Sequence, residues 1–383
     1  MEIKGLVGYR PTVEAVGEVT APPYDVIKPG TPLENVLKSN DNSLFHITLG
    51  PTPKEAMDSL IANGKIILDN EPAFYVYEQN FNGKQRTGVF VAASVSEYAK
   101  GEIIRHEKVF DEKVKGRLEL SLKTDHSFGP VFLLTKSPIS KIMDEIKKTV
   151  TPLYDFTTDL KNTSELHGIY NRVFRVSESS PSGQELKKAL ELNPLYIADG
   201  HHRYHTSLLN NQTHFLTYIC EDAEILAYNR VINGTKKFSE IKSELNLVKV
   251  DKFEMPKKHQ FSIYSKDGAY TLDAKNVPTD VVGTLDCSIL EKEVYPVLGL
   301  THDMIMDEKH FDYYSGDELD KMMECVDSGK YDIAIALHPV YIDELMAVAD
   351  AGLKDSNIVM PEKSTFFAPK ILSGLFIYRY TQK

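Results

Sequence analysis

The sequence predicts a mixed α/β fold, and three observations support this prediction. Residues 73–78 and 86–93 are rich in aromatic and β-branched side chains, which strands favour. Residues 53–70 carry apolar side chains at the spacing of an amphipathic helix. Residues 331–337 form a short apolar run of the kind found in buried strands. Because both kinds of element occur in both halves of the chain, we expect helices and strands to share one mixed architecture.

The N-terminal part of the chain is expected to combine loops, one helix and a β-hairpin. Residues 1–45 are expected to be rich in loops, since Pro22 and Pro23 each fix φ and restrain the preceding residue. Residues 44–49 alternate between apolar and polar side chains, as a strand does. Asn82-Gly83 lies between the two strands named above and favours the tight turn of a hairpin.

Elements of both kinds continue to the C-terminus. Further strands are expected at residues 129–134, 154–157, 171–176, 217–220, 227–232, 269–272 and 374–379, and further helices at 111–123, 138–149, 183–191, 286–298, 317–328 and 341–351. We place a domain boundary in residues 234–237, which divides the chain into residues 1–235 and 236–383. We expect the first region to carry the functional site and the second, also α/β, to support or cover it.

The composition is that of a globular protein without a broad basic surface. The chain has 383 residues, 42% of them hydrophobic and 26% charged, and this length is ample for a large core. Its formal net charge is -11. Because binding along a nucleic-acid backbone requires a basic surface, we expect no general nucleic-acid binding.

Cysteine usage and hydropathy indicate the compartment. Cys220, Cys287 and Cys325 are far apart and form no Cys-x-x-Cys motif, so we expect neither a disulfide framework nor a cysteine metal site. Charged residues interrupt the first ten positions, which lack the apolar core of a signal peptide. No uncharged apolar run approaches the ~18 residues of a membrane span. We therefore expect a cytoplasmic protein with buried free thiols and no membrane partner.

The most informative stretch is residues 195–204 (Leu-Tyr-Ile-Ala-Asp-Gly-His-His-Arg-Tyr). A short apolar run ends at Asp199, and a helix is expected from His201, so the stretch predicts a strand, a tight turn and a helix start. Backbone N–H groups at a helix start have no partners within the helix and attract anions. Gly200 allows a ligand to approach the backbone closely, and Arg203 can bind phosphate or carboxylate oxygens with two donors. These features predict an anion site, and phosphate is the expected anion.

Two other interpretations of this stretch stay open. In the first, Asp199 only caps the helix and Arg203 and the histidines are ordinary surface residues. However, three His, one Arg and one Asp within residues 199–205 are unusual in a chain with 12 His. In the second, His201 and His205 bind zinc from one helix face, since they are spaced as i and i+4. No Glu of the metalloprotease pattern lies between them and no acidic ligand is obvious nearby, so we expect no zinc.

Four carboxylates outside this stretch are candidates for the chemistry. Asp25 lies on a loop made rigid by two prolines, although it could equally accept hydrogen bonds in a turn. Glu107 follows an apolar run, at a strand end where open α/β sheets place site residues, with a surface ion-pair cluster as the alternative. Glu221 and Asp222 follow another expected strand and are candidate Mg²⁺ ligands, since this ion prefers oxygen donors. Their alternative is an acidic surface turn.

Lys363 is the remaining candidate. It begins the sequence Lys-Ser-Thr, but no Gly-x-x-x-x-Gly precedes it, so the segment is not a P-loop. The lysine could still reach a phosphate, and a solvated loop lysine is the alternative. The Gly-x-Gly-x-x-Gly fingerprint and the Gly-x-Ser-x-Gly elbow are both absent from the sequence, so neither a Rossmann cofactor site nor a nucleophile elbow is indicated.

The Gly-His-His-Arg turn at residues 200–203 resembles the phosphate-binding turn of the ParB/sulfiredoxin superfamily, in which Gly-x-His-Arg or Gly-x-x-Arg opens a helix. His201 stands where sulfiredoxins carry Cys, which argues against a sulfiredoxin-type reductase. With Asp199 included, the turn is more similar to the Asp-Gly-His-His-Arg turn of free serine kinases. The resemblance implies a ParB/sulfiredoxin-like N-terminal and central region, followed by an α/β C-terminal region.

The chain as a whole resembles the family named domain of unknown function 1015. Four motifs in order carry this resemblance: residues 22–27 (Pro-Pro-Tyr-Asp-Val-Ile), 106–108 (His-Glu-Lys), 196–204 and 361–365 (Pro-Glu-Lys-Ser-Thr). The family name implies no activity, so the expected function comes from the site.

The resemblance to free serine kinases implies a nucleotide-dependent phosphotransferase that acts on a small hydroxylated metabolite, with free serine the first candidate. A nucleoside di- or triphosphate, bridged by Mg²⁺, would be held by Asp199, Gly200, His201, His202, Arg203 and Lys363. Asp25 or Glu107 would orient or deprotonate the acceptor hydroxyl, and His202 is a further catalytic candidate. The alternatives are nucleotide hydrolysis and a nucleotide-binding regulator without turnover.

Overall fold

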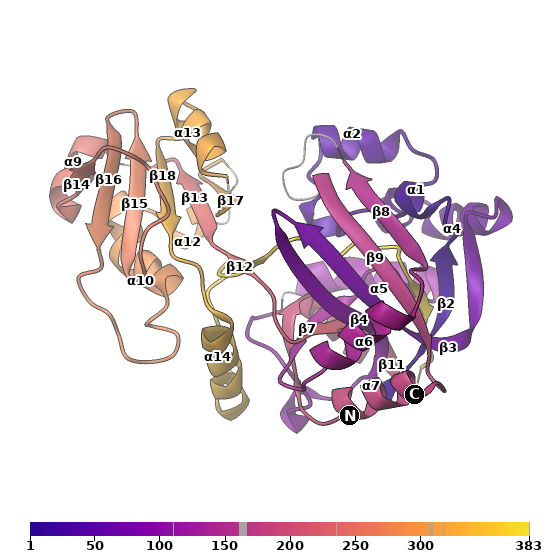
Figure 1. Cartoon of the computed structure of the whole chain (residues 1–383). Coiled ribbons are helices and arrows are strands. Elements are labelled where there is room, and N and C mark those ends of the chain that lie inside the picture. Colours follow the sequence, from indigo (N-terminus) through magenta and orange to yellow (C-terminus); the bar gives the residue numbers. More distant parts are fainter. Residues whose placement is uncertain are drawn as a thin grey trace. The chain divides into compact units, whose positions relative to one another are not determined.

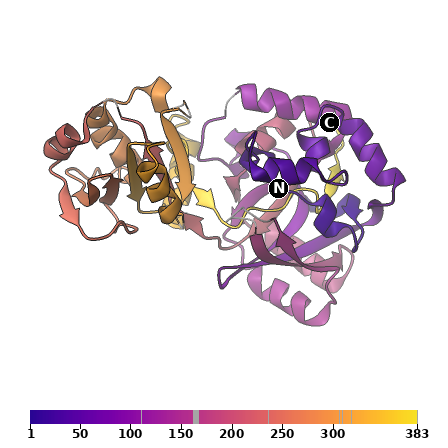
Figure 2. The same cartoon turned by 90° about the horizontal axis from the view of Figure 1, so that it is seen from above.

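The chain folds into two compact units (Figure 1). The computed structural model describes residues 1–109, 111–160, 167–234, 236–305, 307, 309–316 and 318–382. The first unit consists of Met1–Ala223 together with Pro369–Lys383, and the second consists of Glu224–Ala368. The boundary expected from the sequence lies near residue 235, with all later residues in the second region. In the structure, the C-terminal segment (yellow in Figure 2) returns to the first unit.

A large mixed sheet forms the centre of the first unit, with twelve strands among the described residues. Its strands are β1 (Ile3–Lys4), β2 (Leu6–Pro11), β3 (Ile66–Phe81), β4 (Lys84–Ser94), β5 (Ile103–Ile104), β6 (His126–Ser127), β7 (Val131–Thr135), β8 (Tyr154–Asp159), β9 (His167–Ser177), β10 (Leu195–Asp199), β11 (His214–Cys220) and β20 (Ile377–Arg379). The main path runs in the order β5-β10-β7-β11-β4-β3-β2-β20-β6. The mixed α/β fold predicted from the sequence is therefore confirmed.

Strand direction decides which loops share an edge of this sheet. Strand β10 is parallel to β5 and antiparallel to β7, and β7 is parallel to β11. The loops that follow β5 and β10 therefore lie at one edge, and the loop that follows β11 lies at the opposite edge. The predicted hairpin of β3 and β4 is confirmed, because Asn82 and Gly83 have φ angles of 49° and 73°, as its tight turn requires.

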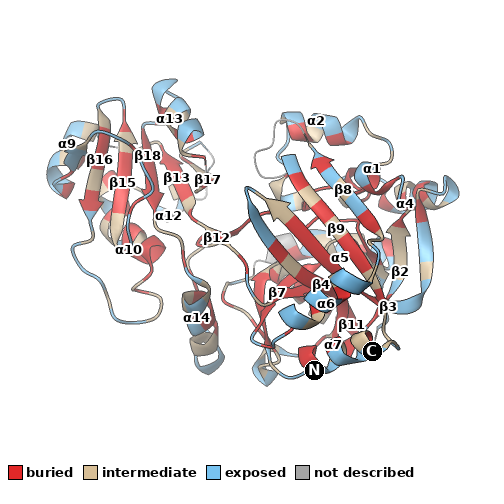
Figure 3. Cartoon of the chain, viewed as in Figure 1, coloured by how far each residue is buried: buried red, intermediate tan, exposed pale blue. Residues whose placement is uncertain are grey.

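Helices cover the sheet of the first unit. They are α1 (Val16–Val19), η1 (Tyr24–Val26), α2 (Pro32–Lys38), α3 (Phe45–Thr48), α4 (Pro53–Ala62), η2 (Tyr98–Lys100), α5 (Asp111–Thr124), α6 (Ser140–Thr149), α7 (Pro181–Leu190) and α8 (His201–Leu209). One apolar core joins strand residues such as Val91, Leu133 and Ile197 to Met143 of α6 and Leu186 of α7. Figure 3 shows the strands of this unit as largely buried.

The second unit contains a six-stranded sheet in the order β14-β16-β15-β18-β13-β17, together with the β12–β19 pair, among the described residues. Its strands are β12 (Ile225–Leu226), β13 (Tyr228–Ile232), β14 (Val248–Val250), β15 (Gln260–Ser265), β16 (Gly268–Asp273), β17 (Phe311–Ser315), β18 (Ile333–Leu337) and β19 (Phe366–Phe367). Its helices are α9 (Phe238–Leu245), α10 (Asp286–Glu293), α11 (Tyr295–Leu298), α12 (His302–Ile305), α13 (Leu319–Asp327) and α14 (Ile342–Lys354). This unit is α/β, as expected.

Several local predictions were wrong. The strand predicted at residues 44–49 is instead helix α3 over Phe45–Thr48, in which Phe45 and Ile47 pack into the core. The helix predicted over residues 53–70 ends at Ala62, since Gly64 has a φ of 65° and β3 begins at Ile66. Residues 1–45 contain two strands and the helices α1, η1 and α2 as well as loops.

None of the described helices is both long and apolar enough to cross a membrane.

Candidate functional site

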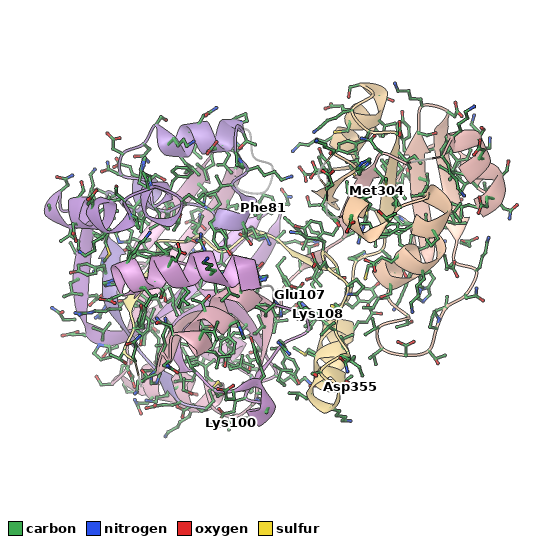
Figure 4. All side chains as sticks on the ribbon, turned by 180° about the vertical axis from the view of Figure 1, so that it is seen from behind. Phe81, Lys100, Glu107, Lys108, Met304 and Asp355 are labelled. Carbon is green, nitrogen blue, oxygen red and sulfur yellow. The ribbon has the colours of Figure 1, made fainter. Side chains whose placement is uncertain are left out.

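The predicted strand, turn and helix start after residue 195 is confirmed. Strand β10 ends at Asp199, Gly200 has a φ of 101°, and α8 begins at His201. A φ in this range favours glycine, so Gly200 makes the sharp turn possible. Strands β5 and β10 are parallel neighbours, and therefore the residues that follow them meet at one edge of the sheet. This edge brings Glu107 to the turn, where its carboxylate lies 3.5 Å from His201 Nδ1. Figure 4 labels Glu107 and its neighbour Lys108.

Arg203 folds back against the turn that precedes its own helix. A Cβ atom at position 200 would lie 2.9 Å from Arg203 Nε, so glycine leaves the room that the guanidinium group occupies. The guanidinium donates hydrogen bonds to the Asp199 carboxylate and to the carbonyl oxygen of Pro130. The turn therefore holds its arginine in one orientation.

Asp199 lies between two cations. Its Oδ1 atom is 3.3 Å from Nζ of Lys370, and its Oδ2 atom accepts from Arg203. Burial alone would raise the pKa of Asp199, but the charges of Lys370 and Arg203 outweigh this effect and hold the pKa well below its usual range. The carboxylate therefore stays ionised at neutral pH and keeps two cations at the turn.

His106, Glu107 and His201 form a second cluster at the same edge. His201 Nδ1 lies 3.5 Å from Glu107 Oε2, and His106 Nε2 lies 3.7 Å from Glu107 Oε1. The two imidazole rings are perpendicular, with centroids 4.5 Å apart. One potential ligand atom from each of the three residues lies within 4.8 Å of the other two, so the cluster could hold a metal ion.

Both imidazole rings of this cluster are buried and neutral. Burial lowers the pKa of His106 to about 4, and the backbone of Ile197 and the charge of Asp199 oppose the shift only in part. Burial, together with the neighbouring His106, also lowers the pKa of His201 well below its usual value. The ring nitrogens of His106 make no hydrogen bond of normal length and angle within the described part of the chain.

A cavity of about 670 Å³, including space open to solvent, lies beside Arg203. Its wall combines the polar residues Tyr24, Arg117 and Arg203 with apolar residues such as Leu120, Phe128 and Phe215. The Arg117 guanidinium lies 3.7 Å from the centre of the Tyr24 ring, in a cation–π contact. The two guanidinium groups in its wall favour an anionic ligand.

Asp25, which the sequence analysis selected, lies beside this cavity on η1 and is exposed. Burial raises the pKa of the adjacent Tyr24, and the charge of Asp25 raises it further, whereas the charges of Arg203 and Arg117 lower it. The charges of Asp25, Arg203 and Arg117 thus all act on the phenol of Tyr24. His202 lies in the first turn of α8 and is partly exposed.

Three other predicted site residues lie elsewhere. Glu221 and Asp222 follow β11. The last residue of β11, Cys220, pairs with Leu134 of β7, and Leu134 pairs in turn with Tyr196 near the start of β10. Glu221 and Asp222 are therefore about four residue positions, or roughly 13 Å along the strands, from the turn. Glu221 instead accepts a hydrogen bond from the backbone N–H of Ser140, at the start of α6. Lys363 belongs to the second unit, where its Nζ lies 5.5 Å from the centre of the Tyr228 ring.

Three residues that the structure brings to the site were not predicted from the sequence. His106 lay within a recognised motif, but its approach to His201 follows from the pairing of β5 with β10. Arg117 lay in a predicted helix of mixed charge with nothing to distinguish it from its neighbours. Lys370 follows Pro369 in the segment that returns to the first unit, and no local pattern indicated its contact with Asp199.

Comparison with known proteins places this α/β chain in a family. The chain belongs to the family described as "Protein of unknown function (DUF1015)", whose pattern matches residues 3–288. The family resemblance is thereby confirmed over a range that contains three of the four motifs, and the motif at residues 361–365 lies outside it. No curated protein matches the chain.

Several solved structures show limited similarity. A mutant of a free serine kinase in complex with ADP has 14% sequence identity and a TM-score of 0.39, over 75% of this chain and 92% of that one. SbnI with a C-terminal truncation, from Staphylococcus aureus, has 11% identity and a TM-score of 0.43, over 76% and 87%. A conserved hypothetical protein from Pyrococcus furiosus has 14% identity and a TM-score of 0.37, over 75% and 95%. TM-scores in this range do not define a shared fold.

Proposed function

We propose that this protein is a nucleotide-dependent phosphotransferase that acts on a small hydroxylated metabolite. The observation that carries the proposal is the position of Arg203, which belongs both to the turn after β10 and to the wall of a cavity that Arg117 also lines. Phosphoryl transfer depends on positioning and on neutralisation of charge more than on covalent chemistry by the protein. A cavity with two guanidinium groups, one of them from the first turn of α8, offers both.

The turn would hold phosphate groups through its backbone and its cations. N–H groups in the first turn of α8 have no acceptor within the helix, and the helix dipole favours an anion there. Arg203 and Lys370 both contact Asp199, so they are already oriented before a phosphate arrives. His202, partly exposed in the same turn, could donate one more hydrogen bond.

Magnesium bound with the nucleotide would neutralise charge on the phosphates. Because Mg²⁺ keeps several waters and needs only one or two carboxylates, Asp199 or Glu107 fits this role at the turn. Glu221 and Asp222 do not fit the role of magnesium ligands at this turn. They follow β11, which runs antiparallel to β10 and therefore ends at the opposite edge of the sheet. A contact between Lys363 and a phosphate stays a prediction from the sequence.

Asp25 is the proposed acceptor for the proton of the substrate hydroxyl. It is exposed and directly follows Tyr24, which lines the cavity. Glu107 is the alternative, but its contacts with His106 and His201 give this carboxylate another role. The similarity of the Asp-Gly-His-His-Arg turn to that of free serine kinases, within the ParB/sulfiredoxin superfamily, supports free serine as the first acceptor to test.

The test is to incubate the full chain with ATP or ADP, Mg²⁺ and a panel of hydroxylated metabolites that includes serine, and to search for phosphorylated product by mass spectrometry. The expected result is one phosphorylated acceptor, with transfer unaffected by Lys188→Ala on the exposed face of α7. Nucleotide hydrolysis without product would indicate a hydrolase. Nucleotide binding without either reaction would indicate a regulator, and both results would contradict the proposal.

A further inference from the structure

The cluster of His106, Glu107 and His201 combines donor atoms from the segments that follow two parallel strands, β5 and β10. Glu107 offers one oxygen toward each imidazole, at 3.7 Å from His106 Nε2 and 3.5 Å from His201 Nδ1. Donors of a tetrahedral zinc ion lie about 3.3 Å apart, since each bond is about 2.0–2.1 Å long. The three side chains therefore need only small movements to share one ion.

His106 provides a second and independent observation. Its side chain has no exposed surface, and its ring nitrogens make no hydrogen bond of normal length and angle among the described residues, although the backbone of Ile197 interacts with the ring. A buried polar group without a partner costs free energy, and such groups in folded proteins call for a missing ion or water. The ring of His106 faces His201 at a centroid distance of 4.5 Å, so its nitrogens border the same cluster.

We infer that His106, Glu107 and His201 form a binding site for one divalent transition-metal ion, with zinc the expected ion. Two imidazole nitrogens and one carboxylate are a donor set that zinc uses in catalytic sites, where the fourth position stays open for water or a ligand oxygen. Mg²⁺ prefers oxygen donors alone and is a poor match for this set.

The other contact of the His201 ring does not oppose this inference. His201 Nε2 accepts a hydrogen bond from the backbone N–H of His106 at 3.5 Å, which is at the outer limit for such a bond. Losing so long a contact on metal binding costs little. No zinc is expected from the pair of His201 and His205, which has no acidic ligand close by in the sequence. In the structure, His205 stacks on Tyr98, and Glu107 from the segment after β5 supplies the carboxylate beside His201.

This inference does not depend on the proposed phosphotransfer. If both are right, Glu107 is a metal ligand and Asp25 alone accepts the proton of the substrate. Metal binding is measured without nucleotide, so that failure of one proposal leaves the other unaffected.

The experiment is a calorimetric titration of chelator-treated full-length protein with Zn²⁺, together with visible absorption during a titration with Co²⁺. We expect one ion per chain and a Co²⁺ spectrum typical of nitrogen and oxygen ligands. Glu107→Gln is conservative and partly exposed, so it should keep the fold, as circular dichroism would verify. Removing a group that only hydrogen-bonds to a metal ligand weakens metal affinity by about 10–100-fold. Because Glu107→Gln and His201→Gln each remove a ligand, we expect each to lower zinc affinity by at least about 100-fold.

The matched control is His167→Gln. His167 is exposed and lies 3.3 Å from Asp159, so it is a histidine–carboxylate pair without a third ligand among the residues that the structure describes. This variant should bind Zn²⁺ as the unaltered protein does. The inference is wrong if the unaltered protein binds no zinc, or if Glu107→Gln and His201→Gln bind it unchanged.

Discussion

Lys370 reaches Asp199 across 171 positions of the sequence, with its Nζ atom 3.3 Å from Oδ1. The lysine is largely buried, and its partner also accepts a hydrogen bond from Arg203. The C-terminal segment of the first unit thus supplies part of the charge balance at the turn before α8. This single contact links the ordering of that segment to the geometry of the candidate site.

Replacing Lys370 with methionine should therefore destabilise the protein. The substitution keeps the length of the side chain but leaves Asp199 with one cation fewer, and hydrogen bonds to charged groups contribute about 1.5–3 kcal/mol. We expect a loss of this size in the free energy of unfolding, measured by urea titration. Lys188→Ala, at an exposed position on α7, should change it by less than about 0.5 kcal/mol. Equal stability of Lys370→Met and the unaltered protein would show that the contact contributes nothing.

Elements of the fold could be predicted where residues close together in the sequence specify them, and not where long-range packing decides the structure. Asn82-Gly83 specified its hairpin because the required positive φ angles are a property of those two residues. Residues 44–49 were predicted as a strand because six residues of alternation cannot exclude a short helix, and long-range packing of Phe45 and Ile47 decided the outcome.

The same distinction holds for the site. The strand end, tight turn and helix start at residues 199–203 could be predicted from the sequence, since glycine and a helix start are local features. His106 and His201 meet because β5 and β10 are parallel neighbours, and no residue near either histidine specifies that pairing. Glu221 and Asp222 were expected with the turn because they also follow a strand, but strand direction was not predictable from the sequence.

Gly200→Ala should destabilise the turn. The φ of 101° is strained for any residue with a side chain, and the added Cβ would lie 2.9 Å from Arg203 Nε. Such strain costs about 1–3 kcal/mol, which urea titration would measure. Gly116→Ala is the matched control, because nothing lies within 4 Å of its Cβ position in α5. That substitution should stabilise the helix by about 0.5–1 kcal/mol. A neutral Gly200→Ala would mean that the turn relaxes without cost.

Asp69 should make stability depend on pH in acid. Burial would raise the pKa of this carboxyl, but hydrogen bonds from Arg175, Tyr75 and Arg10 lower it from its usual 3.8 to about 2. Because the pKa is lower in the folded state, the stabilisation is complete above about pH 4 and is lost as pH falls toward about 2.

The variant Asp69→Asn tests this dependence. It should be less stable than the unaltered protein at neutral pH, and the difference should shrink as the pH of the urea titration falls toward about 2. Asp41→Asn, at an exposed position, should show no such convergence. A stability difference that stays constant with pH would contradict the role of the Asp69 charge.

Arg203→Ala should weaken nucleotide binding by about 1.5–3 kcal/mol, the range for hydrogen bonds to charged groups. Because Arg203 also binds Asp199 and Pro130, affinity must be measured on protein that circular dichroism shows to be folded. Arg203→Lys keeps the charge but loses the paired donors, so its nucleotide affinity should lie between that of Arg203→Ala and that of the unaltered protein. Calorimetry with ATP and ADP measures both variants. Unchanged affinity in folded Arg203→Ala would remove the turn from the nucleotide site.

Asp25→Asn should lower the rate of phosphoryl transfer while nucleotide affinity stays the same. Asp25 is exposed beside the cavity, on η1 rather than in the turn before α8, so its amide should leave phosphate binding intact. A general base contributes about 10²–10⁴-fold, and loss of turnover should fall in this range. Asp41→Asn removes another exposed carboxylate of the same unit and should keep full turnover. If Asp25→Asn retains turnover and Glu107→Gln does not, the proton acceptor is at the histidine cluster. The assignment of Glu107 as a metal ligand can then be tested by adding Zn²⁺ to the assay.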